Sequence, residues 1–211
     1  MFNRGMDFLK KHIKDNLIIY SIIVLVFLIG LSVGAFTVKI VDKHQKQELF
    51  YYLRDFFQLF HTDELSNSSI LKQSFINNIQ LLIFSWFLGV LVITAPLVLF
   101  IIGFKGFVIG FTVGLLIEEF KFLGVLIFIF GVFPQNLVII PVFIIASVIS
   151  LSFAISFLRV KLQKIKDTTF SKRLIFYTSL YSSLLILIMV ACFIEGYIAP
   201  VFIRLITRNI I

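Results

Sequence analysis

The residues best suited to chemistry are two amides inside an apolar stretch. Pro134, Gln135 and Asn136 interrupt the apolar residues 122–158, and Pro141 follows seven residues after Pro134. Primary amides in an apolar environment must find hydrogen-bond partners, or they cost several kcal/mol each. They therefore either cap the ends of their own broken helix or line a polar cavity, as broken helices do in transporters.

Four charged residues stand where apolar segments are expected to end. They are Lys105, Glu118, Glu119 and Glu195. Neighbouring residues of a helix point about 100° apart, so Glu118 and Glu119 are poorly placed to share a proton and read as a solvated helix end. Lys105 marks a short inner turn, and Glu195 is expected near the membrane interface, facing water. An ionisable group buried in a membrane would instead be costly and often functional.

Two sequence motifs of common enzymes are absent. The chain has no H-E-x-x-H and no G-x-x-x-x-G-K-[ST]. Its three histidines do not cluster, and its single cysteine, Cys192, lies in an apolar run. We therefore expect no catalytic residue, no cofactor and no metal site.

Composition places the elements in a membrane. Of the 211 residues, 60% are hydrophobic and only 14% are charged, whereas a soluble domain is about a quarter charged. A spanning helix needs about 20 apolar residues. The net charge of +8 lies beside apolar spans, which indicates membrane orientation and lipid contact and argues against nucleic acid.

We expect an all-α polytopic integral membrane protein that forms one membrane domain over residues 1–211. It has about five transmembrane helices and a re-entrant half-helix before Pro134. The expected spans are 17–38, 79–102 with a kink at Pro96, a short span from Lys105 to Glu119, 137–158 and 174–198.

Charge predicts the orientation of these spans. Residues 1–16 form a basic amphipathic helix, and residues 159–173 form a loop with six basic residues and one acidic residue. The positive-inside rule places both in the cytoplasm. The charge-neutral segment 39–78 then lies outside, with a loop over 41–78 that contains an amphipathic helix. Five crossings leave the C-terminus outside.

Two residue patterns indicate packing or docking surfaces. Glycines four residues apart let helices approach closely, either within the chain or at a homodimer seam. These glycines are Gly30, Gly34, Gly106, Gly110 and Gly114. In the outer segment, an apolar stripe with helical spacing either rests on lipid or docks a partner helix. Its members are Phe50, Leu53, Phe56, Phe57 and Phe60.

Four segments together resemble the stage II sporulation protein M family. They read LFYYL at 49–53, KGF at 105–107 with GFTVG at 110–114, FPQNL at 133–137, and FIEGYIAP at 193–200. The resemblance implies a role in endospore formation, in the septal and engulfing membrane of the mother cell. It also implies a complex with two peptidoglycan hydrolases, the stage II sporulation proteins D and P.

The expected function is therefore a non-enzymatic membrane scaffold that recruits and positions peptidoglycan hydrolases, with membrane lipid as a further partner. The alternative is a permease or channel component that uses the break at Pro134–Asn136. Ion-coupled carriers place charges in the middle of spans. The clear charges of this chain are expected at span ends, which favours the scaffold.

Overall fold

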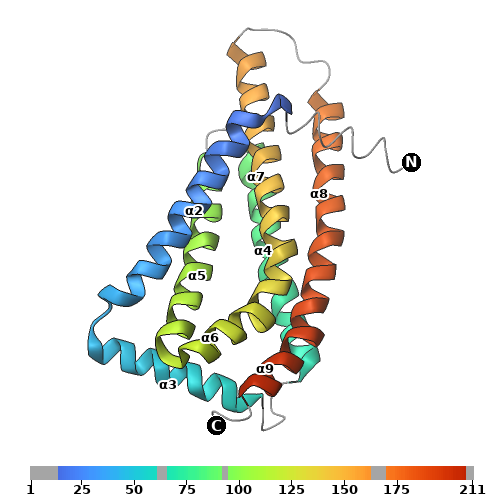
Figure 1. The fold of residues 1–211 in the computed structure, drawn as a ribbon. Helices are drawn as coiled ribbons and strands as arrows, with labels where there is room; N and C mark the ends of the chain where they lie inside the picture. Colours follow the sequence, from blue (N-terminus) through green and yellow to red (C-terminus); the bar gives the residue numbers. More distant parts are fainter. Residues whose placement is uncertain (1–13, 61–65, 92–94, 163–169, 208–211) are drawn as a thin grey trace.

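The computed structural model describes residues 14–60, 66–91, 95–162 and 170–207, and every regular element in these ranges is a helix (Figure 1). The elements are α2 (Leu17–Ile40), α3 (Lys43–Leu59), α4 (Asn67–Val90), α5 (Leu97–Phe120), α6 (Phe122–Ile127), η2 (Phe128–Val132), α7 (Phe133–Leu162), α8 (Phe170–Phe193), η3 (Ile194–Ile198) and α9 (Ala199–Thr207). The prediction of an all-α fold is confirmed. Most of the amphipathic helix expected over residues 1–16 lies outside the described residues.

Four helical stretches are long and apolar enough to cross a membrane. They are Leu17–Ile40, Leu97–Phe120, Phe122–Lys161 and Phe170–Thr207. α4 is as long as α5, and it packs against α7 and α8, but its first half carries many polar side chains. These helices confirm the prediction of a polytopic membrane protein.

The long helices run between two ends of one bundle (Figure 1). α3 lies across one end, together with the junction of α5 and α6 and with α9. We call this the α3 end. The start of α2, the end of α4, the start of α5 and the last turns of α7 lie at the opposite end. α2, α4, α5, α7 and α8 therefore alternate in direction along the bundle.

The expected boundaries of the second and third spans are wrong. α4 ends at Val90, and Pro96 precedes the first residue of α5, so no single helix covers residues 79–102. Proline lacks a backbone N–H, and a helix start leaves such donors unpaired in any case. Pro96 therefore begins a helix and does not kink one. As a consequence, Lys105 lies inside α5 and not in a turn.

The expected break at Pro134 is also wrong, although a short helical piece does precede Pro134, as α6 and η2, and α6 runs at an angle to α7 (Figure 1). The chain stays helical from α6 through η2 into α7, and Pro141 lies inside α7. A wider, π-helical turn replaces the break, because Pro134 has no N–H and its ring clashes with a carbonyl of the preceding turn. The second π-helical turn, η3, ends two residues before Pro200 in the same way.

The glycines fit α2 and α5 tightly against each other. A Cβ atom on Gly30 would lie 2.0 Å from the carbonyl oxygen of Gly103, and one on Gly34 would lie 2.1 Å from that of Phe107. From the other side, Gly106, Gly110 and Gly114 face Phe27, Leu31 and Val38 of α2. The glycine strip is therefore used inside the chain, and this surface is not open to a second copy.

Candidate functional site

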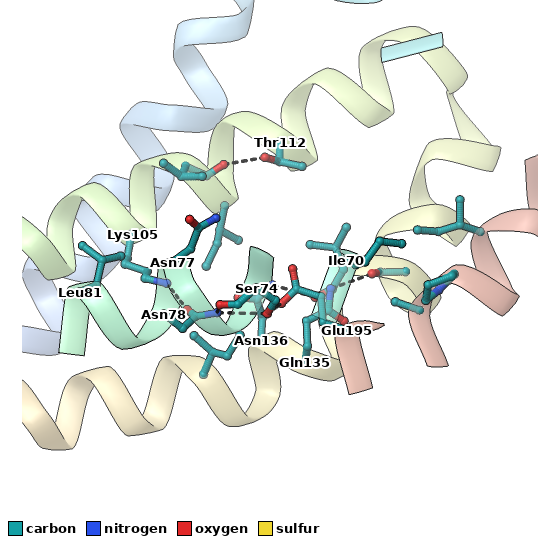
Figure 2. Close-up of a pocket in the computed structure, with 18 of the residues that line it drawn as sticks. Ile70, Ser74, Asn77, Asn78, Leu81, Lys105, Thr112, Gln135, Asn136 and Glu195 are labelled. Carbon is teal, nitrogen blue, oxygen red and sulfur yellow. Dashed lines mark hydrogen bonds between the residues drawn. The ribbon is translucent and has the colours of Figure 1, made fainter. Parts of the chain in front are cut away.

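A polar cavity of about 580 Å³ lies between α4, α5, the start of α7 and the η3–α9 segment. Phe56 of α3 and Phe60, which follows the last residue of α3, also contribute to its wall, so the cavity reaches the α3 end of the bundle. Figure 2 shows the side chains that turn into it, with Lys105 at one end and Glu195 and Gln135 towards the other. Its size falls in the range of small-molecule sites, about 300–1,000 Å³.

A chain of hydrogen bonds links the two charges of this cavity (Figure 2). Lys105 donates from Nζ to Oδ1 of Asn78 at 2.8 Å. Asn78 donates from Nδ2 to the backbone oxygen of Ser74 at 3.0 Å and lies 3.4 Å from its Oγ. Ser74 in turn donates from Oγ to Oε2 of Glu195 at 2.5 Å. An ammonium and a carboxylate are thus joined through two buried neutral side chains.

This arrangement explains how a lysine is tolerated inside a membrane helix. Lys105 is about 12 Å from the start of α5 and about 22 Å from its end, at 1.5 Å per residue. Its Nζ also lies 4.4 Å from the ring centroid of Phe143, where the aromatic face attracts a cation. The opposite charge of Glu195 makes the site neutral as a whole. Lone buried charges are costly, whereas paired and hydrogen-bonded ones are tolerated.

The two predicted amides lie in the first turn of α7. Gln135 donates from Nε2 to the oxygen of Gly131, and Asn136 donates from Nδ2 to that of Val132, both at 2.8 Å. The amides therefore cap carbonyls of their own helix and line the cavity at the same time, so both alternatives hold. Gln135 is only 6% exposed, and its Oε1 accepts no hydrogen bond.

The cavity thus brings together residues that were expected, from the sequence, at three separate places along the chain. They are Lys105, Glu195 and the amides Gln135 and Asn136. The argument that all charges lie at span ends is wrong, because Lys105 is inside α5. Asn78 and Ser74, which connect the charges, were missed in the sequence. Their signal is periodic, since the buried polar residues Ser74, Asn78 and Ser85 recur on one face of α4.

A second buried polar cluster joins α4, α7 and α8 by hydroxyl groups. Tyr181 donates to the carbonyl oxygen of Ala146 at 2.9 Å, and its Oη lies 2.5 Å from Oγ of Ser150. Ser150 donates to the carbonyl oxygen of Ser85 at 3.0 Å. Each of these polar groups has a hydrogen-bond partner within the cluster. The cluster therefore stabilises the packing of α4, α7 and α8.

The apolar stripe of α3 faces mostly into the chain. Phe57 and Phe60 are buried and form a small core with Leu116, Ile127 and Ile203, and Leu53 packs against it. Phe56 is 46% exposed, and Phe50 is partly buried. The expectation that the whole stripe meets lipid or a partner is therefore wrong for Phe57 and Phe60. Phe57 and Phe60 instead hold α3 to the rest of the bundle.

Two ion pairs hold α3 across the end of α5. Lys46 donates from Nζ to Oε1 of Glu118 at 2.9 Å, and Arg54 donates from Nε to Oε1 of Glu119 at 2.7 Å. Glu118 and Glu119 are thus not only a solvated helix end. Because they point to different sides, each reaches a different part of α3.

The outer face of α3 carries two exposed tyrosines. Tyr51 is 68% exposed and Tyr52 is 75% exposed. Both tyrosines belong to the LFYYL segment of the family resemblance, but they are not part of the predicted apolar stripe. Side chains of this kind, rigid and amphipathic, are enriched where proteins bind one another. α3 is therefore a fixed platform with an aromatic outer face.

Within the described residues, no group of three or more His, Cys, Asp or Glu side chains is placed to hold a metal ion.

Comparison with known proteins agrees with the resemblance seen in the sequence. Neither a curated protein nor a solved structure matches the chain. Residues 23–200 match the family described as Stage II sporulation protein M, a range that runs from the first turns of α2 to the start of α9. The chain is therefore a sporulation-related membrane protein and belongs to the stage II sporulation protein M family.

Proposed function

We propose that this protein is a non-enzymatic membrane scaffold that holds peptidoglycan hydrolases close to the membrane during endospore formation. The observation that carries the proposal is α3, a helix fixed across one end of the bundle. Two ion pairs and the buried Phe57 and Phe60 hold it there, while Tyr51 and Tyr52 remain exposed. A scaffold needs a surface of this kind, since a partner binds more tightly to a helix that is already ordered.

The proposal includes an orientation. Arg159 and Lys161 end α7 and Lys172 and Arg173 begin α8, all at the end of the bundle opposite α3. The positive-inside rule favours the cytoplasm for that end. The α3 end and α9 then face the cell wall, where hydrolases act. Within this proposal the protein lies in the septal and engulfing membrane of the mother cell.

The expected partners are hydrolases that resemble stage II sporulation proteins D and P, by family resemblance. The test is affinity purification in mild detergent from sporulating cells, with co-purifying proteins identified by mass spectrometry. We expect the double variant Tyr51→Ser/Tyr52→Ser to recover at least about tenfold less hydrolase than the wild type, because interface tyrosines are often hot spots.

A matched control keeps this test specific. Tyr197 of η3 is also exposed, at 47%, so Tyr197→Ser removes an exposed tyrosine without touching α3. It should leave hydrolase recovery unchanged. Equal recovery with the wild type and the α3 double variant would remove this face of α3 from the proposal.

Transport is the second candidate function, and one observation favours it. Lys105 lies inside α5 and reaches Glu195 through Asn78 and Ser74, as charges do along the pathways of carriers. The test is flux of labelled solutes into liposomes that contain the purified protein. Substrate-specific flux that Lys105→Met abolishes would support transport. If no class of solute shows flux, the scaffold is the remaining proposed function.

A further inference from the structure

The polar cavity contains an acceptor that no group of the chain satisfies. Oε1 of Gln135 is buried and has no hydrogen-bond partner, although Nε2 of the same side chain donates to Gly131. A buried acceptor without a donor is disfavoured. An occupant of the cavity that satisfies Gln135 must therefore present an N–H or O–H group.

The charges of the cavity define the rest of the occupant. Lys105 has three N–H donors, of which Asn78 accepts one, so it has the capacity to bind an anionic oxygen. Glu195 lies towards the other end of the cavity and favours a cation (Figure 2). Glu195 disfavours a simple anion and Lys105 disfavours a simple cation, whereas a zwitterion satisfies both charges.

The rim of the cavity indicates where the occupant comes from. Phe104 and Val108 of α5 line it and are exposed, as are Asn77 and Gln80 of α4. α4 and α5 make few contacts with each other, in contrast to the close pair of α2 and α5. α5 is apolar and long enough to span a membrane, so an opening beside its exposed Phe104 and Val108 faces lipid chains in a bilayer.

We propose that this cavity is a binding site for the head group of a zwitterionic lipid with a primary ammonium. The phosphate faces Lys105, the ammonium donates to Oε1 of Gln135 and faces Glu195, and the acyl chains leave past Phe104 and Val108. A free zwitterion offers the same polar chemistry without chains, and the test separates the two sources. This inference does not depend on the scaffold function or on transport.

The test is native mass spectrometry of the full-length protein with an equal mixture of three lipids that share their acyl chains. One carries phosphoethanolamine, one phosphocholine and one anionic phosphoglycerol. We expect the wild type to retain the ethanolamine lipid about tenfold more than the choline lipid, because a quaternary ammonium has no N–H for Gln135. The anionic lipid should be retained least.

Two variants with matched controls assign the contacts. Gln135→Leu should make the ethanolamine and choline lipids equal, while Lys105→Met should lower the retention of both. The controls Gln47→Leu and Lys39→Met change exposed residues of the same types outside the cavity, and they should retain the wild-type preference.

The wild type alone can overturn the proposal, even if a variant does not fold. Retention of no lipid would mean that water fills the cavity, and equal retention of all three lipids would mean that binding is non-specific. Free phosphoethanolamine is added as a competitor at the same concentration as the lipids. Displacement of the bound lipid at that concentration would overturn the lipid source.

Discussion

Replacing Gly110 by alanine tests the close contact between α2 and α5. A Cβ atom on Gly110 would lie 2.0 Å from the carbonyl oxygen of Leu31 and 2.8 Å from its carbonyl carbon. Ordinary van der Waals contact begins at 3.4 Å. Because the obstacle is backbone, no rotamer change relieves the clash, and the two helices must move apart by more than an ångström.

The expected magnitude follows from two opposing effects. Overpacking of a tight contact costs about 1–3 kcal/mol, while alanine in a helix gains about 0.5–1 kcal/mol over glycine. We therefore expect Gly110→Ala to lower the free energy of unfolding by about 1–2 kcal/mol. Gly103 is the matched control on the same helix, because its Cβ would meet a side-chain methyl of Val26 at 3.2 Å. Gly103→Ala should change stability by less than about 1 kcal/mol.

The assay is reversible unfolding by SDS in mixed micelles, followed by the fluorescence of the chain's single tryptophan, Trp86. Equal stability of Gly110→Ala, Gly103→Ala and the wild type would refute the close approach of these helices. A change in oligomeric mass with unchanged unfolding would instead place the glycine strip at a homodimer seam.

Three further predictions concern buried side chains. Phe57→Ala should lower the free energy of unfolding by about 3 kcal/mol, and Phe56→Ala should lower it by less than about 1 kcal/mol, because only Phe57 is buried, at 3% exposure; similar losses in the same SDS titration would contradict this orientation of α3. Lys105→Met leaves Glu195 without its opposite charge, so the double variant with Glu195→Gln should be more stable than the two single losses predict, by about 1–2 kcal/mol; additive losses in a double-mutant cycle would show that the charges are not coupled. Tyr181→Phe should cost about 1–2 kcal/mol by unpairing buried hydrogen-bond partners, and no loss in thermal unfolding would mean that the hydroxyl cluster contributes nothing.

Features that depend on local sequence could be predicted. Glycines four residues apart indicate a close helix contact whatever the fold, and Gly30 and Gly110 lie in one. The sequence does not say which helix occupies the strip, because that depends on how distant segments pack. The sequence alone is therefore compatible with internal packing and with a homodimer seam, and the packing of α2 against α5 decides for the first.

Features that depend on distant contacts were missed. Lys105 meets Asn78 across 27 residues, and Ser74 meets Glu195 across 121 residues. Averaged hydropathy treats Ser74 and Asn78 as part of a polar loop, and this reading moved the start of the span to residue 79. In the structure these side chains satisfy each other's hydrogen bonds inside the bundle, so a polar stretch becomes part of a helix of the bundle.

The prolines show how far a local rule reaches. The absence of an N–H at Pro134 correctly indicates an irregular backbone nearby, and the carbonyls there need donors. The sequence cannot distinguish a break from a π-helical turn, since Gln135 and Asn136 supply those donors in either case. Here they donate to Gly131 and Val132, and the helix continues.

The central claim, that the outer face of α3 holds a wall hydrolase, is tested most directly by site-specific photo-crosslinking in sporulating cells. A photoreactive residue replaces Tyr52, which is 75% exposed on α3, and in a control it replaces Phe100, which is exposed near the start of α5. The account predicts that position 52 crosslinks to a peptidoglycan hydrolase and that position 100 does not. Hydrolase crosslinks from position 100 and none from position 52 would contradict it.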